Sequence, residues 1–156
     1  MFSDDLKFGK QGEEKIYQYL LTHPNTKYVI DTSDDIFFQS LDIDFLWQTK
    51  NNKIYKLEIK TDRLADKTKN IIYEYYSNKT YQTEGCFEKT EADYILYYII
   101  NENYFYNLNV KKLRQYVNEK KDKLKIKYMG DDALGYIIPI RLIEKYRLGK
   151  KIMLDN

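Results

Sequence analysis

The sequence predicts a single domain of class α/β (α+β), residues 1–156, on three observations. Apolar residues recur at helical spacing near the start of the chain, and two pairs of strand-like runs follow, at 41–62 and at 94–110. A chain of 156 residues with 43% hydrophobic side chains can bury one core and has no room for a second. We divide the domain into a core of about 7–118 and a C-terminal extension of about 119–156.

The composition excludes several classes of protein. Cys86 is the only cysteine and His23 the only histidine, which excludes an internal disulfide and zinc sites built from several Cys or His ligands. The longest apolar run, Tyr94–Ile100, is shorter than the roughly 20 residues that span a bilayer. No signal peptide opens the chain, so we expect a cytoplasmic protein without a membrane partner. The formal charge of +2 gives no global basic excess.

Residues 3–21 are predicted to form an amphipathic helix that ends before Pro24. Its start carries capping and acidic residues: Ser3, Asp4 and Asp5. Four residues recur on one face: Glu13, Ile16, Tyr17 and Leu20. Glu13 is thus a carboxylate on an apolar stripe, either a border residue that reaches solvent or a residue that points toward the sheet. Glu14 lies to one side of this stripe and is the fallback candidate.

The stretch Leu41–Asp62 is predicted to be a hairpin that carries the main functional candidates. Side chains alternate between the faces of a strand. One face of the first strand therefore carries Asp42, Asp44 and Leu46, and one face of the second carries Glu58, Lys60 and Asp62. Two acids and a lysine then converge from adjacent strands, which is an arrangement that a divalent metal can use.

The length of the hairpin loop decides which residue faces Asp44. A two-residue loop at Asn51-Asn52 pairs Asp44 with Ile59, whose neighbour Glu58 then points away. A loop of three residues, with Asn52 in the left-handed region, pairs Asp44 with Glu58. We favour the longer loop or an equivalent bulge, because the alternative separates Glu58 and Lys60 from their only nearby partner.

Other segments are assigned from residue type and spacing. Strands are expected at Lys27–Asp31, at Ile36–Gln39 and at Asn70–Asn78. Glu74, in the middle of the third, is either a solvated residue or an outer residue of a site. A second hairpin is expected at 94–110, followed by a helix that Asn109 caps and on which Leu113, Tyr116 and Val117 share a face.

The C-terminal extension is expected to be less regular. Lys120–Lys127 is a basic run that is either a solvated face or a DNA contact. Tyr136–Ile140 is expected to be a final strand near Pro139, and Arg141–Leu148 a short helix. The tail beyond Gly149 is expected to be loose.

The hairpin residues resemble a known signature. An acid at the end of one strand, here Asp44, followed by an acid-x-Lys triplet on the next, here Glu58-Ile59-Lys60, is similar to the motif of the PD-(D/E)xK nuclease superfamily. Ile43 stands where that motif has its proline. Acid-x-Lys also occurs at Asp5/Lys7, Glu13/Lys15 and Glu119/Lys121. Only the copy at Glu58 lies in a strand paired with an acid-bearing strand.

Two further segments extend the resemblance to about Gly9–Tyr106. The pattern Glu13-x-x-Ile16-x-x-x-Leu20 after Gly12 resembles the first-helix glutamate of archaeal Holliday-junction resolvases. The run from Asn70 through Glu74, Ser77-Asn78, Gly85 and Thr90-x-Ala92-Asp93-Tyr94 resembles a pattern of phage-type nucleases. The resemblance implies a restriction-endonuclease-like core, a central mixed sheet flanked by helices, in a phage or bacterial hydrolase. It also implies a homodimer.

The expected activity is that of a metal-dependent DNA endonuclease, a deoxyribonuclease that uses Mg²⁺ or Mn²⁺. Asp44, Glu58 and the backbone carbonyl of Ile59 would bind the ion, since Mg²⁺ prefers oxygen ligands. Lys60 would orient the attacking water and offset the charge that develops on phosphorus. Glu13 would hold a metal-bound water or assist a second ion. The cut structure, whether a Holliday junction, a flap, a nick or a duplex, stays open.

Supporting residues and alternatives complete the prediction. The second-tier site residues are Glu14, Asp42, Asp62 and Glu74, and the DNA-binding candidates are Lys7, Lys10, Lys67 and Lys69. The main alternative is a non-catalytic DNA-binding or assembly module that retains a nuclease core. A glycosidase that uses Asp44 and Glu58 is weaker, because it gives Lys60 no role. The non-functional interpretation is an exposed ion pair between Glu58 and Lys60, with Asp44 solvated.

Overall fold

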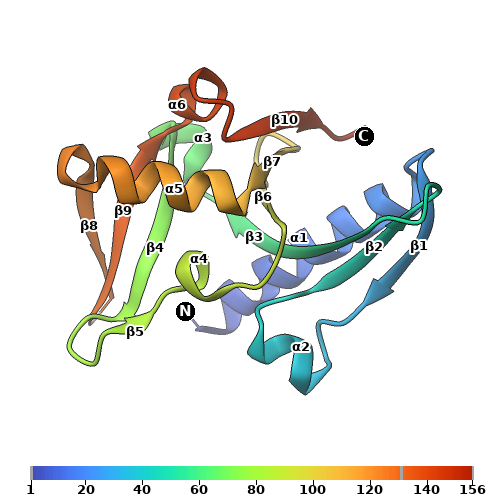
Figure 1. Ribbon diagram of the computed structural model, residues 1–156, viewed down its shortest axis with the longest axis horizontal. Helices are drawn as coiled ribbons and strands as arrows, with labels where there is room; N and C mark the ends of the chain where they lie inside the picture. The colour runs from blue at the N-terminus through green and yellow to red at the C-terminus, as the bar shows by residue number, and fades with distance from the viewer. Residues whose placement is uncertain (1, 131, 156) are drawn as a thin grey trace.

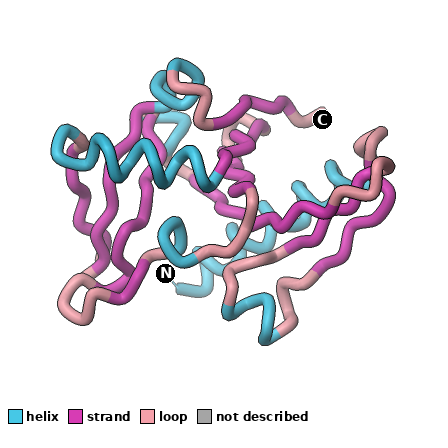
Figure 2. Tube along the Cα trace, in the orientation of Figure 1, coloured by secondary structure: helices cyan, strands magenta, loops and turns pink. Residues whose placement is uncertain are grey.

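The computed structural model describes residues 2–130 and 132–155 and shows a mixed α/β fold built on two sheets (Figures 1 and 2). The six-stranded sheet contains, in spatial order, β1 (Thr26–Asp31), β2 (Phe45–Thr49), β3 (Ile54–Asp62), β6 (Tyr94–Ile99), β7 (Tyr104–Asn109) and β10 (Gly149–Met153). The four-stranded sheet contains β5 (Thr83–Glu84), β4 (Asn70–Asn78), β9 (Ala133–Pro139) and β8 (Lys125–Met129). The predicted α+β class is confirmed.

The helices are α1 (Phe2–Thr22), α2 (Ile36–Ser40), α3 (Ala65–Thr68), α4 (Cys86–Lys89), α5 (Val110–Lys120) and α6 (Ile140–Lys145), with a 3₁₀ turn at Lys121–Lys123. None of the described helices is long and apolar enough to cross a membrane. Asp4 and Asp5 lie in the first turn of α1, where acidic side chains complement the helix dipole. Asn109 caps α5 as predicted, since its side chain accepts a hydrogen bond from the Lys112 amide at 3.0 Å.

The six-stranded sheet is mixed, because β3 and β6 run parallel to each other and all other adjacent strands in the sheet are antiparallel. One core lies between this sheet and α1 and includes Ile16, Leu57 and Ile59. The other core includes residues of β6, β7, the four-stranded sheet, α5 and α6. Because side chains alternate along β3, Glu58 and Lys60 point to the face opposite α1.

The register of the first hairpin is the one that the longer loop predicts. Phe45 pairs with Leu57 and the Thr49 amide donates to the Lys53 carbonyl at 2.9 Å, so the continued ladder sets Asp44 opposite Glu58. Asn52 has φ 64°, the left-handed conformation that this loop requires and that asparagine tolerates. The local chemistry of the loop therefore fixes which residues meet at the far end of the hairpin.

The segment Ile36–Gln39, predicted as a strand, is helical, so that prediction is wrong. Asp35 accepts a hydrogen bond from the Phe38 amide at 3.1 Å and so caps α2. Ile36 is 84% exposed and Phe37 65% exposed. Ile36 and Phe37 are apolar but exposed, so burial does not favour a strand here. The capping residue Asp35 stabilises the helix instead.

The C-terminal predictions need two corrections. The tail beyond Gly149 is ordered as β10, which pairs with β7 along its whole length, and Leu154 after it is buried. Consequently the strand that ends at Pro139 is not the final one. The end of the lysine run also forms the start of β8, a strand that the sequence did not predict. The strand at Asn70–Asn78 and the second hairpin are confirmed.

Candidate functional site

The four predicted catalytic residues line one open pocket of about 520 Å³, which we call the carboxylate pocket. These residues are Glu13 from α1, Asp44 just before β2, and Glu58 and Lys60 from β3. The pocket also receives Asp62 and Arg63 at the end of β3. The sequence motif therefore corresponds to a real convergence of side chains.

Backbone hydrogen bonds hold Asp44 against β3. Its amide donates to the Leu57 carbonyl at 2.8 Å, which extends the hairpin ladder by one residue. Its Oδ2 accepts the Ile59 amide at 2.8 Å. These two hydrogen bonds to the β3 backbone hold the Asp44 carboxylate beside Glu58. The Ile59 amide engages Oδ2 only, and Oδ1 takes no part in this hydrogen bond.

Glu58 and Lys60 form an ion pair that is more buried on the carboxylate side. Lys60 Nζ lies 3.0 Å from Glu58 Oε1, and the two side chains are 37% and 7% exposed respectively. This geometry contradicts the non-functional interpretation of a solvated pair, because Glu58 is almost fully removed from water. A buried carboxylate without full compensation is costly.

The acids of the pocket are held toward their neutral forms. Burial, with a smaller contribution from the charge of Asp44, raises the pKa of Glu58 to about 8 against the opposing effect of Lys60. Burial also raises the pKa of Asp44, although the Ile59 amide and Lys60 counteract it. The pKa of Glu13 is raised by burial and then by the charge of Asp44. A bound cation would relieve all three effects.

Lys60 has a second neighbour that sequence reasoning missed. Burial alone lowers the pKa of Lys60, but its interactions with Cys86 and Glu58 outweigh burial and hold that pKa above its usual value. Burial raises the pKa of the Cys86 thiol to about 12, so Cys86 is uncharged near neutral pH. Lys60 is therefore a fixed cation between a thiol and a carboxyl group. Nothing in the spacing of Cys86 from the motif indicated this contact.

Glu13 reaches the pocket because α1 approaches β3 closely. A Cβ placed on Gly12 would lie 1.8 Å from Thr61 Oγ1, so only glycine permits this approach. Glu13 is half-buried and lines the pocket. Glu14 is exposed on the helix and accepts a hydrogen bond from Gln18 at 2.9 Å, which places the fallback candidate outside the pocket.

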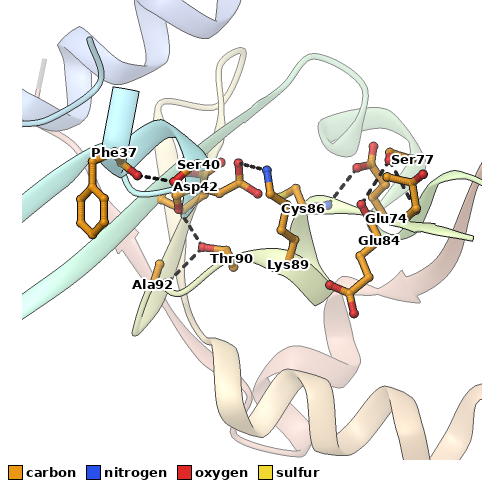
Figure 3. A network of polar contacts seen from close by, with 12 residues as sticks. Phe37, Ser40, Asp42, Glu74, Ser77, Glu84, Cys86, Lys89, Thr90 and Ala92 are labelled. Atoms are coloured by element: carbon orange, nitrogen blue, oxygen red, sulfur yellow. Dashed lines mark hydrogen bonds and ion pairs between the residues drawn. The ribbon is translucent and has the colours of Figure 1, made fainter. Parts of the chain in front are cut away.

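The two other aspartates have structural partners. Asp42 has φ 49° and lies 3.4 Å from Lys89 Nζ, and its carbonyl accepts the Thr90 hydroxyl at 2.7 Å (Figure 3). It does not line the carboxylate pocket. Asp62 does line it, but its carboxylate accepts the amides of Leu64 and Ala65 at the start of α3 and also the Tyr97 hydroxyl. Both behave as turn or cap residues.

Glu74 does not line the carboxylate pocket itself. Its Oε1 accepts a hydrogen bond from the Cys86 amide at 3.0 Å (Figure 3). It also lines a smaller cavity of about 140 Å³ with Cys86, and this cavity shares Lys60 and Thr61 with the carboxylate pocket. Glu74 thus fixes the chain segment that contacts Lys60. This arrangement corresponds to the outer position that the sequence left open.

Two of the predicted DNA-binding lysines lie on α1, which lines the pocket, and two lie in and after α3, which begins directly after the lining residue Leu64. Lys7 and Lys10 are exposed on α1, and Lys10 is 3.8 Å from Asp34. Lys67 and Lys69 are exposed in and after α3. Arg63, which the sequence reasoning missed, lies at the pocket, 2.8 Å from Asp5 and above the ring of Phe8. Its position directly after Asp62 was the signal that could have found it.

The donor set is compatible with a hard divalent ion held largely by water. Asp44, Glu58 and the Ile59 carbonyl would be its ligands, and Mg²⁺ is commonly bound by one or two carboxylates while it keeps several waters. Within residues 2–130 and 132–155, no three His, Cys, Asp or Glu side chains are grouped so as to hold a metal ion. Any ion here would therefore depend on water or on a substrate oxygen for its remaining ligands.

Comparison with known proteins adds no assignment: no family model matches the chain, and no curated protein or solved structure gives a significant match. The resemblance to PD-(D/E)xK nucleases therefore stays a prediction. Function has to be inferred from the pockets themselves.

Proposed function

We propose that the protein is a Mg²⁺- or Mn²⁺-dependent DNA endonuclease of the PD-(D/E)xK type, with its active site in the carboxylate pocket. The observation that carries the proposal is the buried carboxylate of Glu58, which lies opposite Asp44 and 3.0 Å from Lys60 in an open pocket. Two acids and a cation in this relation are what hydrolysis of an anionic ester requires. A divalent ion, when bound, neutralises phosphate charge and lowers the pKa of its water.

Each residue has a distinct task in this proposal. Asp44 and Glu58 supply the oxygen ligands, and Asp44 is oriented by the Ile59 amide. Lys60 orients the attacking water and stabilises negative charge as it develops on the phosphate, an effect that is strongest in a site shielded from water. Glu13, which lines the same pocket, would hold a metal-bound water or assist a second ion.

The surroundings of the pocket are compatible with an anionic polymer. Arg63 lies at the pocket, and exposed lysines occur on α1 and α3 near it: Lys7, Lys10, Lys67 and Lys69. Phosphate contacts of this kind release counterions, so DNA affinity should fall steeply with salt. A homodimer and structure-specific cleavage of the Holliday-junction-resolvase type belong to the proposal through the family resemblance.

Cleavage assays test the proposal directly. Branched, duplex and single-stranded DNA are incubated with the protein in Mg²⁺, in Mn²⁺ and in EDTA. We expect internal cleavage of at least one DNA structure with either metal and none in EDTA. Intact DNA in every metal-containing reaction, at protein concentrations that bind it, would exclude the nuclease.

The alternative is a non-catalytic DNA-binding or assembly module that retains a nuclease core. It is favoured by the finding that no group of three potential metal ligands occurs among the described residues. Such a module would bind DNA in EDTA as well as in Mg²⁺ and would show no Mn²⁺ binding by calorimetry. Metal binding through Asp44 and Glu58 would exclude it.

A further inference from the structure

A second pocket lies on the α1 face of the six-stranded sheet, beside the last turn of α1. It has a volume of about 250 Å³ and shares no lining residue with the carboxylate pocket. We call it the aromatic pocket, because the rings of Tyr19, Trp47, Tyr55, Tyr94 and Phe105 line it, together with His23 and the amides of Asn25, Asn51 and Asn107. The five aromatic residues and Asn107 come from α1, β2, β3, β6 and β7.

The rings of the aromatic pocket form a connected wall. The ring centroids of Trp47 and Tyr55 are 5.7 Å apart, and those of Tyr55 and Tyr94 are 5.8 Å apart. Trp47 Nε1 donates to Thr26 Oγ1 at 2.8 Å, which fixes the indole. All three residues are only partly buried, so part of each side chain remains accessible to a ligand. Aromatic side chains of this kind stack with nucleobases of any sequence.

Asn107 supplies a polar group that has no protein partner. Its Oδ1 is buried and accepts no hydrogen bond from any residue that the structure describes. Asn107 shares a face with Phe105, because the two are separated by one residue of β7. A buried amide oxygen without a partner is unfavourable. A ligand with an N–H group, placed between the rings, would satisfy it, as the edge of a nucleobase does for asparagine.

A basic pocket of about 740 Å³ adjoins the aromatic one, and Tyr94 and Asn107 line both. Its cations are Lys112, Arg147, Lys150 and Lys151, against one acid, Glu144. Lys150 of β10 is directly opposite Asn107 of β7, so the two side chains lie on the same face of the six-stranded sheet. No ion pair engages Lys112, Arg147 or Lys150 within the described part of the chain.

We propose that the two pockets together bind one nucleoside phosphate. The base lies against the rings of Trp47, Tyr55 and Tyr94 and donates an N–H to Asn107 Oδ1. The phosphate lies in the basic pocket, near Lys112, Arg147 and Lys150. The same chemistry belongs to a free nucleotide and to an unstacked nucleotide of a nucleic-acid strand. This site is separate from the carboxylate pocket and needs no metal.

Intrinsic fluorescence reports on this site directly, because Trp47 is the only tryptophan of the chain. The protein is titrated in EDTA with adenosine monophosphate, adenosine, ribose phosphate and inorganic phosphate. We expect saturable quenching by adenosine monophosphate, and binding of adenosine or ribose phosphate that is about tenfold weaker or more. Absence of saturable quenching, or equal affinity for ribose phosphate and adenosine monophosphate, would overturn the proposal.

Variants separate the two halves of the site. Asn107→Leu and Tyr55→Leu should each weaken adenosine monophosphate and adenosine about tenfold. The double variant Lys112→Gln/Lys150→Gln should weaken the monophosphate by a similar factor and leave adenosine unchanged. Lys53→Gln/Lys79→Gln, on exposed residues that line neither pocket, is its matched control and should bind as the wild type does. Thermal midpoints show that each variant is folded. Tyr55→Leu keeps the test decisive if Asn107→Leu is unfolded.

A titration with a short single-stranded oligonucleotide shows whether the site binds a free nucleotide or a nucleotide within a strand. If a short single strand quenches Trp47 at lower concentration than the monophosphate, with the same dependence on Asn107 and Lys150, the ligand is a strand. If the monophosphate binds at least as tightly, it is a free nucleotide. Quenching in EDTA without any cleavage in Mg²⁺ would support the nucleotide site and exclude the proposed nuclease. Cleavage in Mg²⁺ without quenching would support the nuclease and exclude the nucleotide site.

Discussion

The carboxylate pocket and the aromatic pocket use the same sheet in opposite ways. The first concentrates ionisable groups, including Glu58, Asp44 and Lys60, beside a core. The second contains no Asp, Glu, Lys or Arg among its lining residues, and its single unpartnered group is the neutral amide of Asn107. Both pockets hold polar groups that the described protein residues do not fully satisfy. The difference predicts that ligand binding in the first pocket depends on divalent cations and that binding in the second does not.

The largest expected effect is on catalysis at Lys60. Lys60→Met keeps the length and apolar stem of the side chain but removes the charge 3.0 Å from Glu58. Cleavage should fall roughly 100-fold or more, the scale seen when one donor to a developing charge is lost. Metal and DNA should still bind, because Asp44 and Glu58 remain. Cleavage assays and Mn²⁺ calorimetry measure the two effects. Cleavage at the wild-type rate would remove Lys60 from the active site.

Glu58→Gln should change metal affinity and activity together. A neutral amide is a poorer ligand for Mg²⁺, so Mn²⁺ affinity should fall on the order of tenfold or more. Asn107→Leu, in the aromatic pocket, is the matched control and should bind Mn²⁺ as the wild type does. Calorimetric titration measures both variants. Equal loss of Mn²⁺ affinity in the two would show that the pockets are not independent.

Stability should depend on pH through Glu58. Because the folded pKa is raised from 4.5 to about 8, the neutral acid stabilises the fold below pH 4.5 and that contribution is lost as pH rises through about 8. Over this window, without metal, the wild type should lose on the order of a few kcal/mol relative to Glu58→Gln. Urea unfolding at several pH values measures the difference. The control Asn107→Leu should keep the wild-type profile, and a profile that Glu58→Gln leaves unchanged would contradict the raised pKa.

The smallest expected effects concern the helix that borders both pockets. Gly12→Ala would bring a Cβ against Thr61 and should destabilise the fold by about 1–3 kcal/mol. Gly9→Ala, one helical turn away with nothing within 4 Å of its Cβ, should instead stabilise it by about 0.5–1 kcal/mol. Denaturant unfolding measures both. If Gly12→Ala is as stable as Gly9→Ala, the close approach of α1 to β3 does not hold in solution.

The carboxylate pocket could be predicted because its residues are close in sequence and chemically unusual. Asp44, Glu58 and Lys60 lie on one hairpin, and the turn preference of Asn52 fixes their register. Asp42 shares their alternation, but its pairing with Lys89 depends on a segment 47 residues away. Alternation along a strand indicates which side chains can meet. It does not show which of them are already engaged by other elements.

The aromatic pocket could not be predicted, since five elements contribute its rings and amide. Each ring alone is indistinguishable in sequence from an ordinary core residue. The same limit explains β10: the stretch Gly149–Met153 contains Lys150 and Lys151 and has no apolar alternation, yet backbone pairing with β7 orders it. Hydrogen bonds to a neighbouring strand are not visible in side-chain pattern. At α2, by contrast, a local signal was present, because Asp35 is a capping residue that favours a helix over the strand suggested by the apolar run after it.

Neither sheet is continuous along the chain. The segment with β4 and β5 lies between β3 and β6, and the segment with β8 and β9 lies between β7 and β10. During synthesis, β7 therefore emerges with one edge unpaired and stays so until β10 has left the ribosome. The two sheets cannot be separated by any single cut of the polypeptide, and pairing over such sequence distances slows folding. We therefore expect the two sheets to form and unfold as one cooperative unit, and to form only after β10 has been synthesised.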